Sequence, residues 1–345
     1  MTTAHAGNNQ PLRVGLIGTG KIGRMHAGLL ATQVQGAVLA CVADADPAAA
    51  AAVGAGMAVP AVSPDSVLAD PSVGAVAICA ATPAHVPLIV AAARAGKAIF
   101  CEKPVSLDLA EVDRALAEVQ GAGVPLMVGF NRRFDPSHAA VHDAVASGRA
   151  GATDLVRITS RDPLPPPLSY AATSGGLFLD MTIHDFDMAR FVVGSEVTDV
   201  FAWGAIKVEP GLAALGDIDT AVTSLRHENG CLTVIDNCRR ASYGYDQRVE
   251  VLGSLGLAAS ENPLVTTSLW RGPAGTELAP LPDFYLDRYR TSYLRQWDAF
   301  VAAVKTEQAP PTTGQDGRAA LVLGLAAKLS LAEARPVRVT EVSAG

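Results

Sequence analysis

Two side chains suited to acid and base chemistry, Asp180 and His184, lie four residues apart in the segment GGLFLDMTIHDFDMARF, residues 175–191. Residues four apart on an α-helix are neighbours on one face, so a helix here would let the carboxylate orient the imidazole. Such a pair can accept a proton near neutral pH, because the carboxylate stabilises the charged ring. A buried helix in which the two side chains only satisfy one another fits the same spacing, so both interpretations stay open.

Length and charge favour a folded protein of two domains that binds a small molecule. The chain has 345 residues, and domains commonly hold about 100 to 200. Its formal net charge of -7 disfavours a general affinity for nucleic acid or an anionic membrane. The N-terminal residues lack the pattern of a signal peptide, and no apolar run approaches the roughly 18 residues of a membrane span. We therefore expect a cytoplasmic protein.

The five cysteines, at positions 41, 79, 101, 231 and 238, are odd in number and lack CxxC spacing. Three of them lie inside apolar runs that are typical of strands. This context favours buried, reduced thiols over disulfides or a metal site, and no metal is expected.

A glycine-rich loop follows the first apolar run, residues 12–17. In this loop, GTGKIG, Gly18, Gly20 and Gly23 match the pattern G-x-G-x-x-G, and a helix is expected over residues 22–32. Such glycines permit a tight turn, let backbone N–H groups approach a pyrophosphate, and let the helix pack closely on the strand. The loop, including Lys21 and Ile22, is therefore expected to bind a dinucleotide.

The second apolar run, residues 37–43, ends at Asp44, about two dozen residues after the first glycine. Dinucleotide-binding folds place there a carboxylate that binds the adenosine ribose hydroxyls. No basic residue follows Asp44 in ADADPAA, and its charge would repel a 2′-phosphate, so the sequence favours NAD over NADP. The alternative is that Asp44 only caps a helix over residues 48–53.

Strands expected over residues 75–80, 98–101 and 126–129 alternate with helices over 83–95 and 109–122. This alternation is typical of a parallel sheet covered on both faces, which binds ligands at the carboxyl ends of its strands. Further cofactor-binding residues expected at these ends are Ala81, Thr82, His85, Glu102 and Lys103. In CEKP, Lys103 would bring a cation to the site, although a surface lysine in a loop is the alternative.

Beyond residue 130 the runs 153–161, 197–208, 220–227, 231–238 and 247–253 alternate polar and apolar residues, and HENG at 227–230 indicates a turn. Half-buried antiparallel strands have this pattern. The sequence therefore predicts an α/β protein: an N-terminal Rossmann NAD-binding domain over 1–130, and a C-terminal α+β domain over 131–345 on a large open, mostly antiparallel sheet. Candidate hydroxyl-binding side chains in the second domain are Arg133, Arg161, Tyr170, Tyr243 and Tyr289.

Taken together, GTGKIG, the acid of VAD, Glu102-Lys103-Pro104, GFNRRFDPS and the segment 175–191 resemble the Gfo/Idh/MocA oxidoreductases, above all their bacterial inositol 2-dehydrogenases. The resemblance runs from about residue 12 to residue 337 and includes SYGYDQRVEVLGSLG and FYLDRYRTSY. It implies a two-domain, NAD-dependent enzyme of inositol catabolism, assembled as a homotetramer through its C-terminal sheets. The lysine of EKP and the acid and imidazole of D-x-x-x-H, here Lys103, Asp180 and His184, would be the catalytic set.

The implied reaction is the oxidation of a cyclic polyol, myo-inositol, to 2-keto-myo-inositol. His184 would take the hydroxyl proton, Asp180 would stabilise the charged ring, and Lys103 would stabilise negative charge on oxygen. With Arg133, Arg161 and Tyr243, these residues form the expected substrate site. The alternatives are a dehydrogenase of the same fold acting on an aldose, an anhydrosugar or another inositol isomer, and a non-catalytic dinucleotide-binding sensor.

Overall fold

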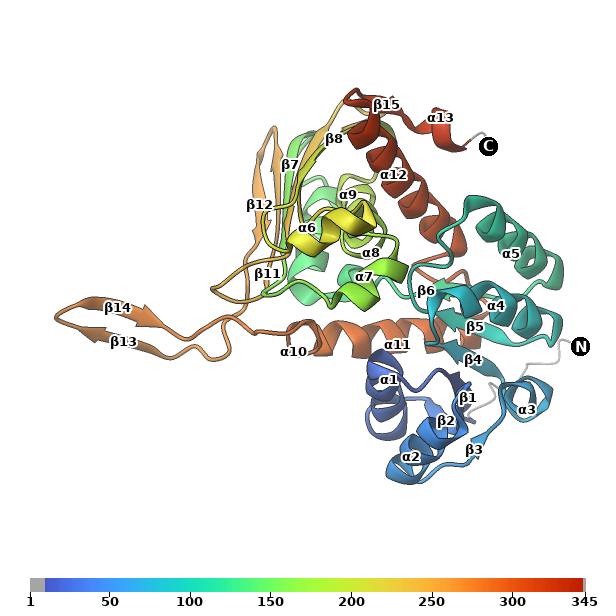
Figure 1. The fold of residues 1–345 in the computed structure, drawn as a ribbon. Helices are drawn as coiled ribbons and strands as arrows, with labels where there is room; N and C mark the ends of the chain where they lie inside the picture. The colour runs from blue at the N-terminus through green and yellow to red at the C-terminus, as the bar shows by residue number, and fades with distance from the viewer. Residues whose placement is uncertain (1–9, 344–345) are drawn as a thin grey trace, which may run out of the picture. The chain divides into compact units, whose positions relative to one another are not determined.

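The computed structural model describes residues 10–343 and divides them into two compact units (Figure 1). The first unit contains the chain up to Gly129 together with Leu294–Gly314. The second contains Phe130–Tyr293 and the chain from Gln315 onward. The single boundary predicted near residue 130 therefore does not include the return of Leu294–Gly314 to the first unit.

The first unit is built on a six-stranded parallel sheet in the order β3-β2-β1-β4-β5-β6. Its strands are β1 (Leu12–Ile17), β2 (Ala37–Ala43), β3 (Ala61–Val62), β4 (Ala75–Ile78), β5 (Ala98–Cys101) and β6 (Leu126–Val128). The strand order reverses between β1 and β4, and ligands of such sheets bind at that point. In the register, Ile17 at the end of β1 pairs with both Ala43 and Ile78, so these strand ends meet at one edge.

Helices connect these strands, as the alternation in the sequence predicts. They are α1 (Lys21–Thr32), α2 (Pro47–Met57), α3 (Pro64–Ala69), α4 (His85–Arg94) and α5 (Leu109–Ala122). Side chains of Asp46, Ser63 and Asp108 cap α2, α3 and α5 through hydrogen bonds to backbone N–H groups. The helix expected over 83–95 begins instead with a 3-10 turn, η1 (Thr82–Ala84).

Helix α11 (Arg290–Thr306) contributes its later turns to the first unit. The Trp297 ring stacks on Phe100 of β5 at a centroid distance of 4.6 Å, and Phe300 meets both rings edge-on. All three side chains are fully buried. Burial of such aromatic area explains why this distant segment packs with the N-terminal sheet.

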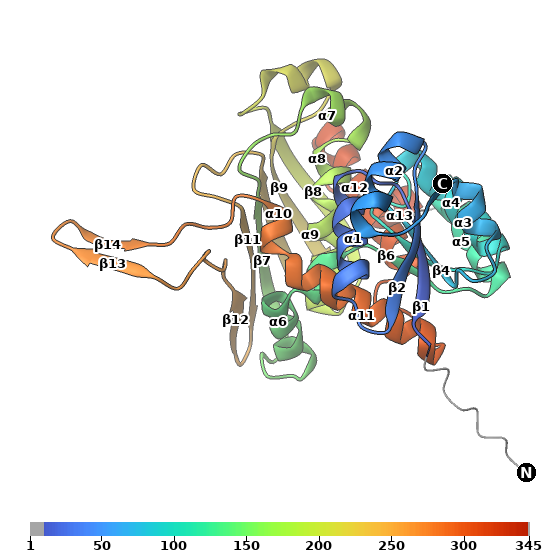
Figure 2. The same ribbon diagram turned by 90° about the horizontal axis from the view of Figure 1, so that it is seen from below.

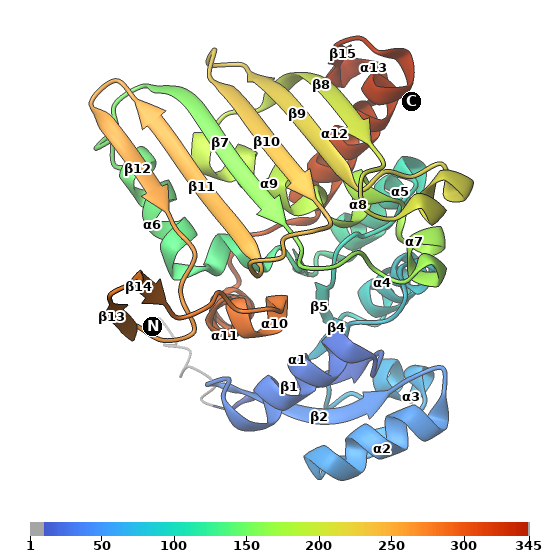
Figure 3. The ribbon, with the colours of Figure 1, turned by 60° about the vertical axis from the view of Figure 1, so that its left-hand side comes forward.

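The second unit is built on a seven-stranded sheet in the order β12-β11-β7-β10-β9-β8-β15, which Figure 3 shows face on. Its strands are β7 (Thr153–Arg161), β8 (Val197–Ala205), β9 (Thr220–His227), β10 (Leu232–Cys238), β11 (Asp246–Gly253), β12 (Gly256–Ser260) and β15 (Val337–Arg338). All neighbours pair antiparallel except β7 and β10, which are parallel. The predicted HENG turn joins β9 to β10.

The longer helices of the second unit lie on one face of this sheet (Figure 3). The longer helices are α6 (Pro136–Ala146), α9 (Ile183–Val193) and α12 (Gly314–Glu333), and the shorter ones are η2 (Asn131–Phe134), α7 (Leu168–Ser174), α8 (Leu177–Asp180), η3 (Pro210–Leu215), α10 (Tyr285–Arg288) and α13 (Val339–Ser343). A separate two-stranded hairpin, β13 (Leu269–Gly272) and β14 (Gly275–Leu278), extends from the sheet as an arm (Figures 1 and 2).

The prediction of a single helix over residues 175–191 is wrong, because the structure has two helices there. The first ends at Asp180 and the second begins at Ile183. The N–H of Thr182 reaches five residues back, to the carbonyl of Leu177 at 3.0 Å, and the N–H of Asp185 then bonds to Thr182 at 2.8 Å. This switch in hydrogen-bond spacing ends α8 and begins α9. Asp180 and His184 therefore lie on two successive short helices.

Within the described residues, no helix is both long enough and apolar enough to cross a membrane. Cys41, Cys79, Cys101 and Cys231 are buried free thiols, and Cys238 is a half-buried one. Burial raises the pKa of the Cys79 and Cys101 thiols, which keeps them protonated.

Candidate active site

The three glycines of the loop after β1 serve two different purposes. A Cβ on Gly18, whose φ is +102°, would lie 2.4 Å from the backbone of Ala80, and a Cβ on Gly23 would lie 1.9 Å from the Gly18 carbonyl oxygen. Both positions therefore require glycine for packing. A Cβ on Gly20 would meet nothing within 4 Å, so this position leaves open space where a ligand can approach the backbone.

Gly20 is also the residue before α1, and no side chain caps that helix. The first backbone N–H groups of a helix have no partner within it, and they attract anions. Lys21 and Ile22 supply the first of these groups, and Lys21 is exposed. The open space and the uncapped helix together fit the pyrophosphate of a dinucleotide.

The carboxylate of Asp44, at the end of β2, is hydrogen-bonded to the same loop. Its Oδ2 accepts from the N–H and the hydroxyl of Thr19 at 2.6 and 2.8 Å, and its Oδ1 accepts from the N–H of Asp46 at 3.0 Å. Burial opposes ionisation of Asp44, but the hydrogen bonds from Asp46 and Thr19 outweigh it and lower its pKa. Asp44 therefore carries a fixed negative charge, as the preference for NAD requires, and it also shapes the glycine loop.

The strand ends of β4 and β5 meet around Lys103. The ring of His85, at the start of α4, lies with Nε2 2.9 Å from the Ala80 carbonyl and Nδ1 2.7 Å from the Pro104 carbonyl. It thus joins the end of β4, where Ala81 and Thr82 follow, to the residue after Lys103. The backbone N–H of Lys103 itself donates to the carboxylate of the preceding residue, Glu102, at 3.3 Å. The backbone that presents the lysine is therefore anchored at both neighbours.

Glu102 belongs to a buried chain of hydrogen bonds that sequence reasoning missed. Its Oε1 lies 2.8 Å from Nε2 of His26, and Nδ1 of His26 accepts from the indole N–H of Trp297 at 2.9 Å. Because the indole can only donate, the proton of His26 must be on Nε2, directed at Glu102. The three residues are far apart in sequence, so no local pattern could reveal this support for the strand end that carries Lys103.

In the second unit, the carboxylate of Asp180 is held from both sides. Its Oδ1 accepts from the hydroxyl of Tyr170 at 2.9 Å, and its Oδ2 accepts from the guanidinium of Arg239 at 3.2 Å. Arg239 is buried, whereas Tyr170 is half exposed. His184 follows in the first turn of α9, half-buried, with the ring of Phe130 edge-on at a centroid distance of 6.1 Å.

A further acid, Asp162, joins this cluster and was not predicted. The pKa of Asp162 is raised to about 6, chiefly by burial; the charges of Asp180 and Asp185 add to the shift, while Arg239 and Arg132 oppose it. A carboxyl group that titrates near neutral pH beside two other carboxylates is typical of functional sites. The sequence signal that could have found it is its position directly after the strand β7.

Arg133, a predicted substrate ligand, is engaged by two carboxylates of its own unit. Its guanidinium donates to Asp187 of α9 at 2.5 and 2.8 Å and to Asp316 of α12 at 2.9 Å. These partners raise its pKa despite the opposing effect of burial. The contacts give Arg133 a structural role, and substrate binding by it stays a prediction.

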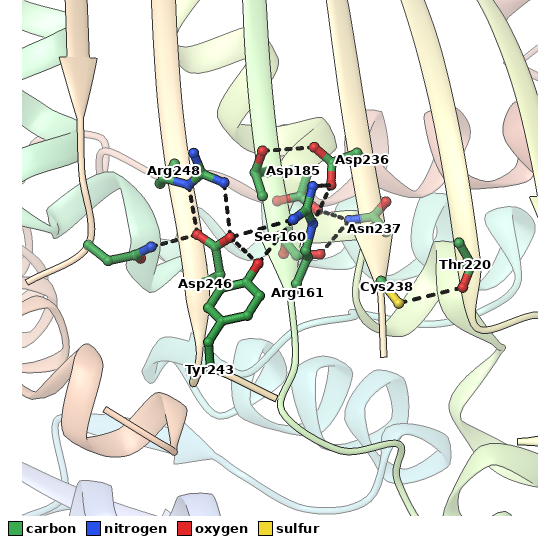
Figure 4. A network of polar contacts seen from close by, with 12 residues as sticks. Ser160, Arg161, Asp185, Thr220, Asp236, Asn237, Cys238, Tyr243, Asp246 and Arg248 are labelled. Carbon is green, nitrogen blue, oxygen red and sulfur yellow. Dashed lines mark hydrogen bonds and ion pairs between the residues drawn. The ribbon is translucent and has the colours of Figure 1, made fainter. Parts of the chain in front are cut away.

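Arg161 and Tyr243, also predicted to bind substrate, meet on the sheet (Figure 4). Arg161 donates to Asp236 at 2.6 Å and to the Tyr243 hydroxyl at 3.0 Å, and that hydroxyl donates to Asp246 at 2.7 Å. Successive side chains of a strand point to opposite faces, so Arg161 faces away from Ser160, which is buried on the helix side. Their role in substrate binding also stays a prediction.

Comparison with known proteins decides the family. Residues 12–130 match the oxidoreductase family with an NAD-binding Rossmann fold, and residues 138–259 match the GFO/IDH/MocA C-terminal domain. The chain belongs to the Gfo/Idh/MocA family of oxidoreductases. Membership confirms the predicted fold class, the assignment as an NAD-dependent dehydrogenase, and the cofactor.

Several relatives are similar along nearly the whole chain. The myo-inositol 2-dehydrogenase of Thermotoga maritima is 46% identical, with 96% of this chain and 99% of the relative covered. The inositol 2-dehydrogenase of Rhizobium meliloti is 44% identical, with 95% and 99% covered. A crystal structure of scyllo-inositol dehydrogenase from Lactobacillus casei, with bound NAD(H) and scyllo-inositol, superposes with a TM-score of 0.89 at 28% identity and covers 96% of this chain and 100% of that one.

Proposed function

We propose that this enzyme oxidises a cyclic polyol and that its substrate is myo-inositol, which becomes 2-keto-myo-inositol. The observation that carries the proposal is the Asp180 carboxylate, fixed by Tyr170 and Arg239 just ahead of His184. Relatives that are 46% and 44% identical over almost their full length are named as inositol 2-dehydrogenases. An acid and an imidazole at a substrate hydroxyl are what oxidation of a carbinol requires.

In this proposal His184 is the general base that takes the proton of the reacting hydroxyl. The negative charge of Asp180 stabilises the resulting imidazolium, and Tyr170 and Arg239 keep that carboxylate in place. The ammonium of Lys103 stabilises the negative charge that builds on the substrate oxygen. NAD, when bound, supplies the nicotinamide ring that accepts the hydride.

The cofactor is assigned to the strand ends of the first unit. The uncapped start of α1 and the open space at Gly20 would hold its pyrophosphate, and Asp44 would accept hydrogen bonds from the adenosine ribose. The fixed negative charge of Asp44 supports NAD over NADP. The second unit would hold the polyol. The first domain would thus bind the cofactor and the second the substrate, as the sequence predicts.

The outer face of the seven-stranded sheet supports a homotetramer assembled through this face. Trp203, Leu232 and Leu257 have 61%, 48% and 57% of their surface exposed, and Val222 and Leu252 are exposed beside them. In the strand register Trp203 lies opposite Val222, and Leu252 lies opposite Leu257. Exposed apolar patches of this kind are common at contact surfaces between proteins. A closed assembly with two-fold axes would cover such patches. We place the assembly in the cytoplasm, a site that its five free thiols support.

The test is reduction of NAD by the purified protein with a panel of myo-, scyllo- and chiro-inositol, glucose and xylose. We expect the highest kcat/KM with myo-inositol and little turnover with the aldoses. Preference for glucose or xylose would replace inositol with a sugar as the substrate. Absence of turnover with every polyol, together with tight NAD binding, would support the non-catalytic sensor instead.

A further inference from the structure

The break between α8 and α9 is bridged by one side chain of the sheet, Asn237 of β10. Its Oδ1 accepts from the hydroxyl of Thr182, the residue before α9, at 2.9 Å. Its Nδ2 donates to the carboxylate of Asp185, in the first turn of α9, at 2.8 Å. Thr182 and Asp185 flank the segment that contains His184, so a single amide holds this segment at both ends.

The orientation of the Asn237 amide is fixed by the chemistry of its partners. A carboxylate such as that of Asp185 can only accept, so it must face the NH2 group, which leaves the amide oxygen for the Thr182 hydroxyl. That hydroxyl has one proton, and the amide oxygen at 2.9 Å is closer than the Leu177 carbonyl at 3.3 Å. The Asn237 amide can therefore satisfy both partners in one orientation only, with its oxygen towards Thr182 and its NH2 group towards Asp185.

The bridge is fully buried and backed by a cation. Thr182, Asp185 and Asn237 have at most 1% of their surface exposed. On the other side of Asp185, the guanidinium of Arg132 in η2 donates to its Oδ1 at 2.6 Å. A buried polar network with all partners present is rigid, because each lost bond would leave a desolvated group unpaired.

We propose that Thr182 and Asn237 are positioning residues for His184. They hold the helix break in the one geometry that keeps the imidazole against the reacting hydroxyl. The inference rests on the proposed function, in which His184 is the general base. A network that only stabilises the fold would have the same burial and bonds, so the test must separate base positioning from stability.

The variants are chosen to remove one hydroxyl without changing shape. Thr182→Val removes the hydrogen bond to Asn237, and Thr182→Ser keeps it. Thr223→Val is the matched control, because Thr223 of β9 is equally buried and its hydroxyl lacks a hydrogen-bond partner within the described residues. Asn237→Asp is a second route, since a carboxylate can still accept from Thr182 but cannot donate to Asp185.

Turnover with myo-inositol, its pH profile, the KM for NAD and the melting temperature are measured on the same samples. We expect Thr182→Val and Asn237→Asp to lower kcat roughly 10- to 100-fold, the loss that a misplacement of about 1 Å produces. The acidic limb of the kcat profile should also move, while the KM for NAD changes less than about twofold. Thr182→Ser and Thr223→Val should retain wild-type kcat and its pH profile.

The proposal is overturned if Thr182→Val matches Thr223→Val in kcat and pH profile, or if Thr182→Ser is as impaired as Thr182→Val. If Thr182→Val does not fold, Asn237→Asp decides by the same criteria. If wild type oxidises no polyol, the proposed function fails, and histidine NMR then decides the positioning. The His184 ring signal, identified by its loss in His184→Ala, should shift in Thr182→Val and stay in place in Thr182→Ser. An unshifted signal in both would overturn the inference.

Discussion

Replacing Asp162 with asparagine should stabilise the protein at neutral pH and have little effect on its stability in acid. Asparagine has the shape of a protonated aspartic acid and cannot ionise, so Asp162→Asn fixes the neutral form of the side chain. Burial raises the pKa of Asp162 to about 6, with the charges of Asp180 and Asp185 adding to the shift and Arg239 and Arg132 opposing it. Ionisation of Asp162 is therefore unfavourable in the folded protein.

The size of the effect follows from linkage. The pKa of Asp162 rises from an ordinary value of 3.8 to about 6, and each pKa unit corresponds to about 1.36 kcal/mol, so ionisation costs the fold about 3 kcal/mol. The penalty is absent below the pKa of the unfolded chain, grows as the pH rises towards the folded pKa, and is complete above it. The folded protein binds the extra proton in this window, so stability falls with rising pH.

The assay is thermal unfolding of wild type and Asp162→Asn, without ligands and at equal protein concentration, near pH 4 and pH 7.5. About 3 kcal/mol corresponds to a rise in Tm of roughly 6 to 12 °C at neutral pH for a domain of this size. Near pH 4, just above the unfolded pKa of 3.8, the difference should shrink to about 0.6 kcal/mol, or roughly 1 to 2 °C. Asp154→Asn, at an exposed position of β7, is the control and should change Tm little at either pH. Equal stabilisation at both pH values, or a lower Tm at pH 7.5, would refute the reasoning.

Three further predictions concern chemistry, cofactor and assembly. His184→Ala and Lys103→Ala should each lower kcat roughly 100- to 10,000-fold with NAD affinity nearly intact, since neither is assigned to the adenosine or the pyrophosphate. Near wild-type turnover in a folded variant removes that residue from the mechanism. Asp44→Ser with Ala45→Arg should shift kcat/KM towards NADP by removing repulsion and adding a phosphate partner, and equal use of both cofactors by wild type would contradict the role of Asp44. Trp203→Glu should lower the assembly mass in light scattering, whereas a monomeric wild type at micromolar concentration rules out the tetramer.

Local pattern was sufficient to predict most of the scaffold. The strands β1, β2, β5, β7 and β9 have the bounds expected from their apolar or alternating runs, because such runs depend only on which faces are buried. Where an alternating run continues into a loop, the predicted strand was too long. The strand expected over residues 197–208 ends at Ala205. The glycine loop and Asp44 already predicted the cofactor, and family resemblance added the enzyme class.

Contacts between distant parts of the chain could not be predicted in this way. The hydrogen-bonded chain of Glu102, His26 and Trp297 joins positions 76 and 271 residues apart. The break between Asp180 and His184 is bridged by Asn237 of β10, which lies 55 residues after Thr182. Helical spacing alone predicted that Asp180 and His184 share a face. Their actual placement is set by tertiary hydrogen bonds, which no periodicity encodes.

The motifs NRRF and HDFD acquire a common explanation in the structure. Neighbouring arginines of η2 each bind one of two alternate aspartates of α9: Arg132 with Asp185 at 2.6 Å, and Arg133 with Asp187 at 2.5 Å. Both aspartates are completely or almost completely buried. Removing one partner of such a pair lowers the free energy of unfolding by about 3 to 5 kcal/mol, whereas the intact pair adds little net stability. The pairs therefore act mainly by fixing the positions of the two helices. The two pairs fix η2 and α9 in one register around His184, so each arginine has a carboxylate partner within its own unit.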